Sequence, residues 1–367
     1  MSLKIEDFTF PLKVAQKVEE TREATSFVFE IPAELKSKFE YQPGQFVSLF
    51  LNVNGEELSR SYSLGSSPEA DRDFKITVKR VDGGRGSNYL CDHIQVGDSL
   101  RVSPPSGHFF KYQGEVKHYV LFGAGSGITP LFSILKYVLK KNPQAQVTLV
   151  FANRSEEHII YRQELQKWAE EHSSRFQIHH LLSQPGTAWE LPTSRLTEGW
   201  LKAFSKTLDV KPFEIYLCGP DGYMELVKNT LSGCGVPEEN IHQESFTTTT
   251  SVTNKPATDV DGKTLIGTAT PEMEDTYEVE VTLSGETKTF TIDKDSSILE
   301  ALIEQGENPP YSCMDGGCMA CMGKVLEGVV MQEDPGILTQ ENIDVGECLT
   351  CQAKPRARKV KVTYDIF

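Results

Sequence analysis

The chain has 367 residues, more than one ordinary domain contains, and its length predicts two or three domains. Hydrophobic residues make up 38% and charged residues 24%, as in a globular protein, and the net charge of −15 argues against binding to nucleic acids or to anionic membranes. No apolar run approaches membrane-spanning length and the first residues lack a signal-peptide core, so we expect a cytoplasmic protein whose eight cysteines bind metal or pack rather than form disulfides.

The first block, residues 1–112, has the pattern of a small antiparallel β-barrel. Short apolar runs broken by Pro, Gly and Asn predict six strands, and one stretch predicts a helix. The expected strands cover residues 14–18, 26–30, 45–51, 61–64, 74–80 and 99–102, and the expected helix covers residues 87–94.

Two motifs in this block predict an FAD site. In the run Arg60-Ser61-Tyr62-Ser63, an arginine can pair with a pyrophosphate, an aromatic ring can stack on a planar ring, and a hydroxyl can reach a flavin N5. Further on, the run that begins at Lys79 contains a glycine turn and opens a short helix, whose free N–H groups bind anions. Either motif alone is commonly a surface feature, but their order within a β domain favours FAD.

The second block, residues 115–246, alternates strands with helices. This alternation predicts a parallel sheet covered by helices on both faces, as in Rossmann-like domains. The expected strands are residues 118–122, 147–152, 176–182 and 214–218, and the expected helices are residues 131–139, 159–171 and 223–232.

A glycine-rich run follows the first strand of this block. Gly123, Gly125 and Gly127 precede Thr129 and a helix, so the backbone can approach the pyrophosphate of a dinucleotide. The run is not the strict Gly-x-Gly-x-x-Gly string, and the alternative interpretation is a strand-to-helix turn that binds nothing.

The end of the second strand bears on which nicotinamide nucleotide is used. A 2′-phosphate requires a cation and a hydroxyl there, whereas NADH favours a carboxylate. Arg154 and Ser155 therefore predict NADPH, and the adjacent Glu156 and Glu157 leave NADH possible.

The last part of the chain begins with a segment poor in apolar residues. Residues 247–276 predict a linker of about 30 residues. Residues 277–283 and 287–292 predict a hairpin that turns at residues 284–285, and residues 297–305 predict a helix. Residues 277–367 hold 16 acidic and 8 basic residues, which gives either a solvated surface or an acidic face that steers a basic partner.

Four cysteines in this last block have a distinctive spacing. Cys313, Cys318, Cys321 and Cys351 follow the pattern Cys-x4-Cys-x2-Cys-x29-Cys, which is the plant-type pattern for a [2Fe–2S] cluster. A structural zinc site, which also uses four thiolates, is the alternative. Cys348 lies close to the fourth position, and we expect it to be a small buried residue.

These motifs and their order resemble those of ferredoxin–NADP reductase-type flavoproteins that carry a C-terminal plant-type ferredoxin. The resemblance covers nearly the whole chain except the linker, and it is greatest to reductases of the phenylacetyl-CoA epoxidase type and of Rieske oxygenases. It implies a FAD-binding barrel at residues 1–112, an NAD(P)-binding α/β domain at residues 115–246 and an α+β (β-grasp) ferredoxin domain at residues 277–367.

The resemblance also implies roles for individual residues. Ser63, Cys218 and Phe246 would lie at the site of hydride transfer. The residues expected to contact FAD or the nicotinamide nucleotide are Arg60, Ser61, Tyr62, Ser63, Lys79, Gly86, Ser87, Gly123, Gly125, Gly127, Thr129, Arg154, Ser155, Gly219 and Pro220. The metal ligands would be the four spaced cysteines. Core packing is the alternative role for Cys218 and Phe246.

We therefore expect an electron-transfer enzyme that takes a hydride from NADPH, passes electrons through FAD and the cluster, and delivers them to a partner oxygenase or hydroxylase. Two other classes remain open, a redox sensor without catalysis and a zinc-stabilised interaction protein. The sequence names neither the terminal acceptor nor the oligomeric state.

Overall fold

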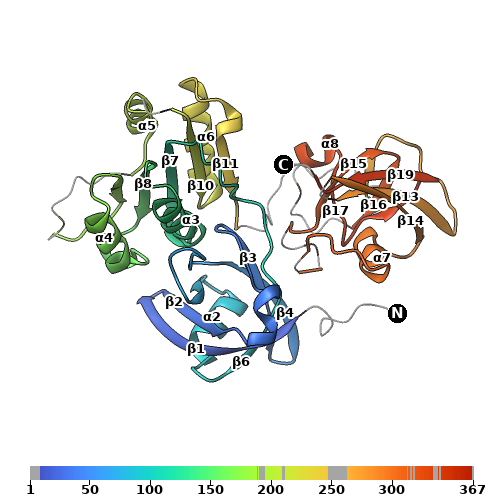
Figure 1. Ribbon diagram of the computed structural model, residues 1–367, viewed down its shortest axis with the longest axis horizontal. Helices are drawn as coiled ribbons and strands as arrows, with labels where there is room; N and C mark the ends of the chain where they lie inside the picture. The colour runs from blue at the N-terminus through green and yellow to red at the C-terminus, as the bar shows by residue number, and fades with distance from the viewer. Residues whose placement is uncertain are drawn as a thin grey trace. The chain divides into compact units, whose positions relative to one another are not determined.

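The computed structural model describes residues 9–187, 189, 195–208, 211–246, 263–283, 285–311, 313–314, 316, 319–333, 338 and 340–365. Contacts divide the chain into two compact units. The first is Phe10–Thr247, and the second contains Thr248–Phe367. Figure 1 shows the first unit in blue to yellow and the second in orange to red.

The first unit begins with the predicted antiparallel barrel. Its strands are β1 (Phe10–Thr21), β2 (Ala24–Glu30), β3 (Phe46–Val53), β4 (Glu56–Ser63), β5 (Phe74–Lys79) and β6 (Ser99–Val102), in the order β4-β3-β6-β1-β2-β5. A bridge between Leu64 and Ile76 joins the two outer strands and closes the barrel. Val47 and Leu49 of β3 point into the barrel core and are fully buried, and Ser48 and Phe50 on the other face of the strand are buried as well. The helix is α2 (Arg85–His93).

A parallel sheet forms the rest of this unit. Its strands are β7 (His118–Ala124), β8 (Gln146–Asn153), β9 (Phe176–Leu182), β10 (Phe213–Cys218) and β11 (Ile241–Glu244), in the order β11-β10-β7-β8-β9. Strands β8 and β9 follow β7 on one side of the sheet, and β10 and β11 are then added on the other side of β7. The order therefore reverses between β7 and β10, which is where open parallel sheets bind ligands.

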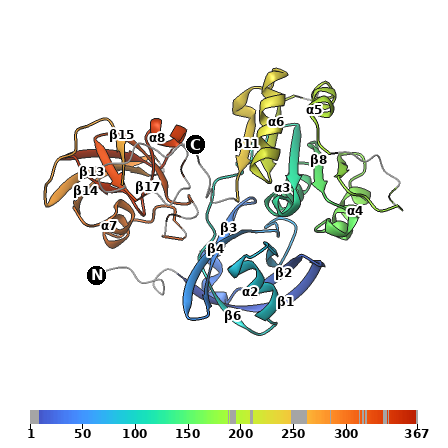
Figure 2. The same cartoon turned by 180° about the vertical axis from the view of Figure 1, so that it is seen from behind.

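Helices cover both faces of this sheet, as predicted (Figures 1 and 2). Side chains of α3 (Ile128–Lys141) and α4 (Arg162–Glu171) share one core with Tyr119 and Leu121 of β7, whereas α5 (Glu198–Ser205) and α6 (Asp221–Gly233) share another with Val120 and Phe122. Prediction missed α5 and β11. Helix α4 starts later than expected because Tyr161 has a left-handed backbone with φ of 60°.

The described part of the second unit combines two sheets with two short helices. Strands β13 (Thr276–Leu283), β14 (Glu286–Asp293), β15 (Met322–Glu327), β17 (Glu347–Leu349) and β19 (Lys359–Thr363) form a sheet in the order β14-β13-β19-β15-β17, in which β13 and β19 are parallel. Strands β12 (Thr264–Gly267), β16 (Val329–Gln332) and β18 (Lys354–Pro355) form the smaller sheet.

Helix α7 (Ile298–Glu304) buries Ile298, Leu299 and Leu302 in the core of this unit, and Ser297 and Glu300 form a capping box at its start. Helix α8 is Gln340–Asp344. The mixed sheet with a helix packed in its core confirms the predicted α+β fold.

The predicted linker of residues 247–276 needs a correction. Residues 264–267 form β12, which pairs with β16, so the last part of that segment belongs to the ferredoxin-like unit. Its composition is polar, but Ile266 alternates into the core and is fully buried. Residues 247–262 lie outside the described residues.

Candidate functional site

Strand β4 and helix α2 together form a cradle on the barrel. A Cβ placed on Gly86 would lie 3.0 Å from Cγ of Arg60, so the arginine side chain passes directly over this glycine. Gly84 precedes α2 with no side-chain cap, and the Ser87 hydroxyl accepts a hydrogen bond from the Val81 N–H at 3.2 Å. An exposed guanidinium beside an uncapped helix start fits the pyrophosphate of FAD.

The other residues of the Arg60 motif alternate along β4. Ser61 is exposed, and its hydroxyl lies 2.8 Å from that of Ser48. Tyr62 is half-buried against the barrel core, and burial raises the pKa of its hydroxyl well above the ordinary value. Ser63 is buried at the end of the strand and faces the α/β domain.

The glycine-rich loop lies at the carboxyl end of β7. Gly125 has a left-handed backbone with φ of +55°, which favours glycine. A Cβ on Gly127 would lie 2.0 Å from the carbonyl oxygen of Cys218, so this loop touches the end of β10. The Thr129 hydroxyl donates to the carbonyl of Ser126 at 2.8 Å and holds the turn. The loops that follow β7 and β10 therefore meet, and these are the two neighbouring strands between which the strand order reverses.

Residues after β10 complete this contact. A Cβ on Gly219 would lie 3.0 Å from Cβ of Ala124, so no larger residue fits between the loops without a shift. Pro220 follows and stands at the N-cap of α6. Gly123 pairs in register with Cys218, which fixes the two strand ends at the same level.

Three side chains from three distant segments meet at this point. The Ser63 hydroxyl donates to the Glu244 carboxylate at 3.4 Å, and Glu244 pairs in register with Cys218 on the adjacent parallel strand. Burial, and secondarily the Glu244 carboxylate, raises the pKa of the Cys218 thiol well above its ordinary value, so the thiol is neutral. Burial likewise raises the pKa of Glu244 to about 8.

Sequence reasoning missed Glu244. In this part of the chain the sequence predicts a role for Phe246 alone, which lies two residues beyond β11 and is 47% exposed. A single glutamate near the end of a domain gives no signal in the sequence. Only the pairing of β11 with β10 brings Glu244 to Ser63, which is 181 residues away along the chain.

The residues expected at the adenosine end lie around the end of β8. The Arg154 side chain is 69% exposed, and the Ser155 hydroxyl lies 2.8 Å from Nδ1 of His158. Glu156 accepts hydrogen bonds from the Gly186 N–H at 3.0 and 3.1 Å, which lowers the pKa of its carboxyl group and engages the carboxylate elsewhere. Lys79 of the barrel reaches this region, because its Nζ lies 3.4 Å from a Cβ placed on Gly125.

Three of the four spaced cysteines are described, and all three are buried in the second unit. Cys318 lies outside the described residues. The carbonyl of Cys321 accepts hydrogen bonds from the Thr350 N–H at 3.2 Å and from its hydroxyl at 2.7 Å. The Gln352 amide donates to the Met314 carbonyl at 3.2 Å and lies 3.6 Å from Sγ of Cys351. The loop around Cys313 is thus held against the segment of Cys351.

The backbone of this loop fits an anionic cluster. Met314, Gly316 and Met319 have φ values of 59°, 81° and 57°, and such left-handed residues turn successive N–H groups toward one point. Cys348 instead lies on β17, where it pairs with Gly323, and burial raises the pKa of its thiol to about 12. Its position is that of a packing residue.

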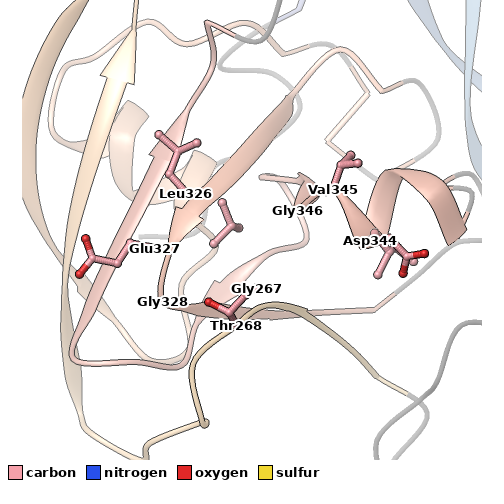
Figure 3. Close-up of a pocket in the computed structure, with 10 residues that line it drawn as sticks. Gly267, Thr268, Leu326, Glu327, Gly328, Asp344, Val345 and Gly346 are labelled. Carbon is pink, nitrogen blue, oxygen red and sulfur yellow. The ribbon is translucent and has the colours of Figure 1, made fainter.

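A hollow of about 120 Å³ also lies in the second unit (Figure 3). Glycines at positions 267, 328 and 346 line it together with Leu326 and Asp344. None of its lining residues is one of the spaced cysteines, so the hollow is separate from the cluster loop.

Comparisons with known proteins identify the three domains of the chain. Family models for the oxidoreductase FAD-binding domain, the oxidoreductase NAD-binding domain and the 2Fe-2S iron-sulfur cluster binding domain match residues 11–112, 121–229 and 281–356. The ferredoxin reductase component of 3-ketosteroid-9-alpha-monooxygenase from Rhodococcus rhodochrous is 36% identical over 96% of each chain. A component of the 1,2-phenylacetyl-CoA epoxidase from Escherichia coli K12 is 32% identical over 96% of this chain and 97% of that one.

The chain belongs to the family of FAD- and [2Fe–2S]-containing reductase components of oxygenase systems. Among solved structures, phthalate dioxygenase reductase matches 98% of both chains with a TM-score of 0.56 at 24% identity, and so shares the fold of this reductase. The reductase is an oxidoreductase with FAD-binding, NAD-binding and 2Fe-2S domains. Among the helices of its described residues, none combines the length and apolar character needed to cross a bilayer.

Proposed function

We propose that this reductase oxidises NADPH and delivers electrons, through FAD and its [2Fe–2S] cluster, to the oxygenase component of a multicomponent system. The meeting of Ser63 from the barrel with Cys218 and Glu244 from the α/β sheet carries this proposal. It combines a flavin-cradle strand and a dinucleotide loop at one point, as direct hydride transfer requires. When bound, the flavin supplies hydride acceptance and the cluster supplies single-electron transfer.

The residues of the chain would bind and orient FAD and the nucleotide, and one of them would hold a proton. Arg60 and the start of α2 would hold the FAD pyrophosphate, and Tyr62 and Ser63 would position the ring. Gly125, Gly127 and Thr129 would admit the nucleotide backbone, with Gly219 and Pro220 beside it. Glu244 would keep its proton at neutral pH, because its pKa is about 8, and so would add no negative charge beside the nicotinamide.

The choice of NADPH rests on Arg154 and Ser155 at the end of β8, while the Glu156 carboxylate is engaged by Gly186. Arg154→Ala should lower kcat/KM for NADPH about ten-fold and leave that for NADH within two-fold, because only NADPH carries the 2′-phosphate. An equal loss with both nucleotides would remove the NADPH assignment and favour NADH.

Two classes of oxygenase are candidates for the partner that receives the electrons. The epoxidase component from Escherichia coli and the Rhodococcus monooxygenase component are similar to this chain over nearly their whole lengths, so we propose an oxygenase of the phenylacetyl-CoA epoxidase type and, as the second candidate, a Rieske-type hydroxylase. The acidic balance of residues 277–367, 16 acidic to 8 basic, favours a partner with a basic docking face.

The deciding experiment is a visible spectrum of the purified protein under anaerobic conditions. Flavin and iron–sulfur absorption should both bleach on addition of NADPH. The absorption should recover when the oxidised partner oxygenase is added, and adding the epoxidase-type and the Rieske-type components separately shows which of them is the partner. A colourless protein would indicate zinc, and a coloured protein that neither nucleotide reduces would indicate a redox sensor. The buried free thiols of Cys91 and Cys218 are compatible with the cytoplasm that we propose as its location.

A further inference from the structure

The turn between β1 and β2 carries an acidic residue that neither the flavin cradle nor the dinucleotide loop explains. Glu23 follows Thr21 in this turn, and its N–H donates to the Thr21 hydroxyl at 3.2 Å. Its carbonyl accepts from the Arg80 N–H at 2.7 Å. Both backbone groups are thus engaged, so the barrel fixes the direction from which the carboxylate projects.

Basic side chains from both domains of the first unit converge on this carboxylate. Nζ of Lys79 lies 3.7 Å from Oε2 of Glu23, and Nη1 of Arg154 lies 3.8 Å from its Oε1. Nε2 of His158 lies 3.6 Å from the same Oε1. We refer to Lys79, Arg154 and His158 as the basic cluster. The carboxylate is 37% exposed, so water and a ligand can both reach it.

The basic cluster lies where a nucleotide would place its phosphates. Lys79 borders the glycine-rich loop through Gly125, and Arg154 stands at the end of β8, next to Ser155. The Ser155 hydroxyl bonds His158, so the hydroxyl and the imidazole form one unit beside the arginine. A 2′-phosphate at this strand end would interact with Lys79 and Arg154, the cations that Glu23 already neutralises.

We propose that Glu23 is a specificity-determining residue, an internal counter-ion that competes with the 2′-phosphate of the nucleotide for the basic cluster and so lowers the affinity for NADPH relative to NADH. The inference rests on the nucleotide position given above, but not on which nucleotide turns over faster. A phosphate must displace the carboxylate from Arg154 or bind close to a like charge, and either costs affinity.

The test uses Glu23→Gln in the full-length holoenzyme, with adenosine 2′,5′-bisphosphate and 5′-ADP as competitive inhibitors. The variant should bind the bisphosphate about five-fold more tightly, and its affinity for 5′-ADP should stay within two-fold, since only the bisphosphate carries the 2′-group. The gain should shrink at 0.5 M salt, because these charges are partly exposed. Glu19→Gln makes an equal charge change at an exposed position of β1 and is the matched control. It should change the inhibition constant of neither the bisphosphate nor 5′-ADP.

A second pair of variants locates the effect. Combining Glu23→Gln with Arg154→Ala should abolish most of the five-fold gain, because the carboxylate acts through the arginine. Glu23→Asp, which keeps the charge but withdraws it, should give an intermediate gain and covers the case in which the glutamine variant fails to fold. An unchanged constant for the bisphosphate, or an equal gain for both inhibitors, would overturn the proposal. Faster turnover of NADH by the wild type would refute the NADPH assignment alone.

Discussion

Gly127 lies where the loop after β7 crosses the backbone of Cys218. Its φ of −60° suits any residue, so the glycine is required there by space alone. Glu244 shows the opposite kind of constraint, because its carboxyl group is placed where ionisation is costly. Two residue-level features therefore shape the candidate site: Gly127 has no side chain to obstruct the contact between the loops, and the raised pKa of Glu244 favours its protonated form.

Gly127→Ala should separate the two loops. The added methyl would lie 2.0 Å from the Cys218 carbonyl oxygen, so the backbone must shift. We expect kcat/KM for the nicotinamide nucleotide to fall at least ten-fold and the free energy of unfolding to fall by about 3 kcal/mol. Gly222→Ala in α6 is the control, because its added methyl meets nothing within 4 Å, and it should be neutral in both assays. Similar kinetics for the two variants would argue against the loop contact as a binding feature.

Glu244→Gln should change how stability depends on pH. The folded-state pKa of about 8 exceeds the ordinary value of 4.5, so the folded protein holds an extra proton between these values and wild-type stability declines as pH rises through them. The glutamine variant lacks this decline. Its thermal midpoint should match the wild type at pH 5 and exceed it by roughly 5 °C at pH 9. Parallel pH profiles would show that this carboxyl group does not titrate as described.

The two neighbouring cysteines at the end of the cluster segment should respond differently. Cys351→Ser removes an expected ligand and should abolish the iron–sulfur absorption, with little iron or sulfide left by chemical analysis. Cys348→Ala removes a buried thiol on β17 and should retain the cluster, with about 1 kcal/mol lost in stability. A cluster that survives the first change and is lost in the second would reverse the assignment of the fourth ligand.

At the scale of elements, helix α3 joins the barrel to the α/β sheet. The Lys136 side chain is fully buried, donates to the Gly65 carbonyl at 2.9 Å and pairs with Asp71 of the barrel. Burial lowers the pKa of this lysine, and the Asp71 carboxylate counteracts the shift. The Ser133 hydroxyl of the same helix donates to the Ser66 carbonyl at 2.5 Å. These polar contacts fix the orientation of the barrel relative to the α/β sheet and so hold Ser63 beside Glu244.

Lys136→Met should destabilise the first unit by about 3 kcal/mol in urea unfolding, because it leaves Asp71 without its cationic partner and the Gly65 carbonyl without the Lys136 donor. The added change Asp71→Asn should recover part of this loss, which a double-mutant cycle measures. Lys141→Met tests an exposed pair on the same helix, since Nζ of Lys141 lies 3.0 Å from Glu69, and should cost less than about 1 kcal/mol. Equal costs for the two lysines would mean that burial adds nothing at Lys136.

At the scale of the whole molecule, electrons must pass between two units that the chain connects through residues 247–262. This stretch is rich in Thr, Asp and other polar residues, a composition that predicts a linker. The predicted linker is shorter than residues 247–276, because β12 belongs to the second unit.

Deleting eight residues of this stretch should slow reduction of the partner oxygenase several-fold, while flavin reduction by NADPH in stopped flow stays unchanged. The reason is that a shorter tether restricts the positions at which the cluster can dock. Replacing the same eight residues with Gly and Ser, at constant length, is the control and should preserve both rates. Unchanged partner reduction after the deletion would show that the length of this stretch is not limiting.

Features that depend on neighbouring residues can be predicted from the sequence of this chain. The six strands of the barrel, the alternation of strands and helices in residues 115–246 and the spacing of the cysteines are local patterns, because side-chain period and ligand spacing are fixed along a continuous chain. Three other features become visible once the chain is folded: Glu244 lies beside Ser63 and Cys218, Glu23 faces Arg154, and residues 264–267 form a strand. These contacts join residues far apart in sequence, and strand pairing and domain packing create them without leaving a local pattern to predict them.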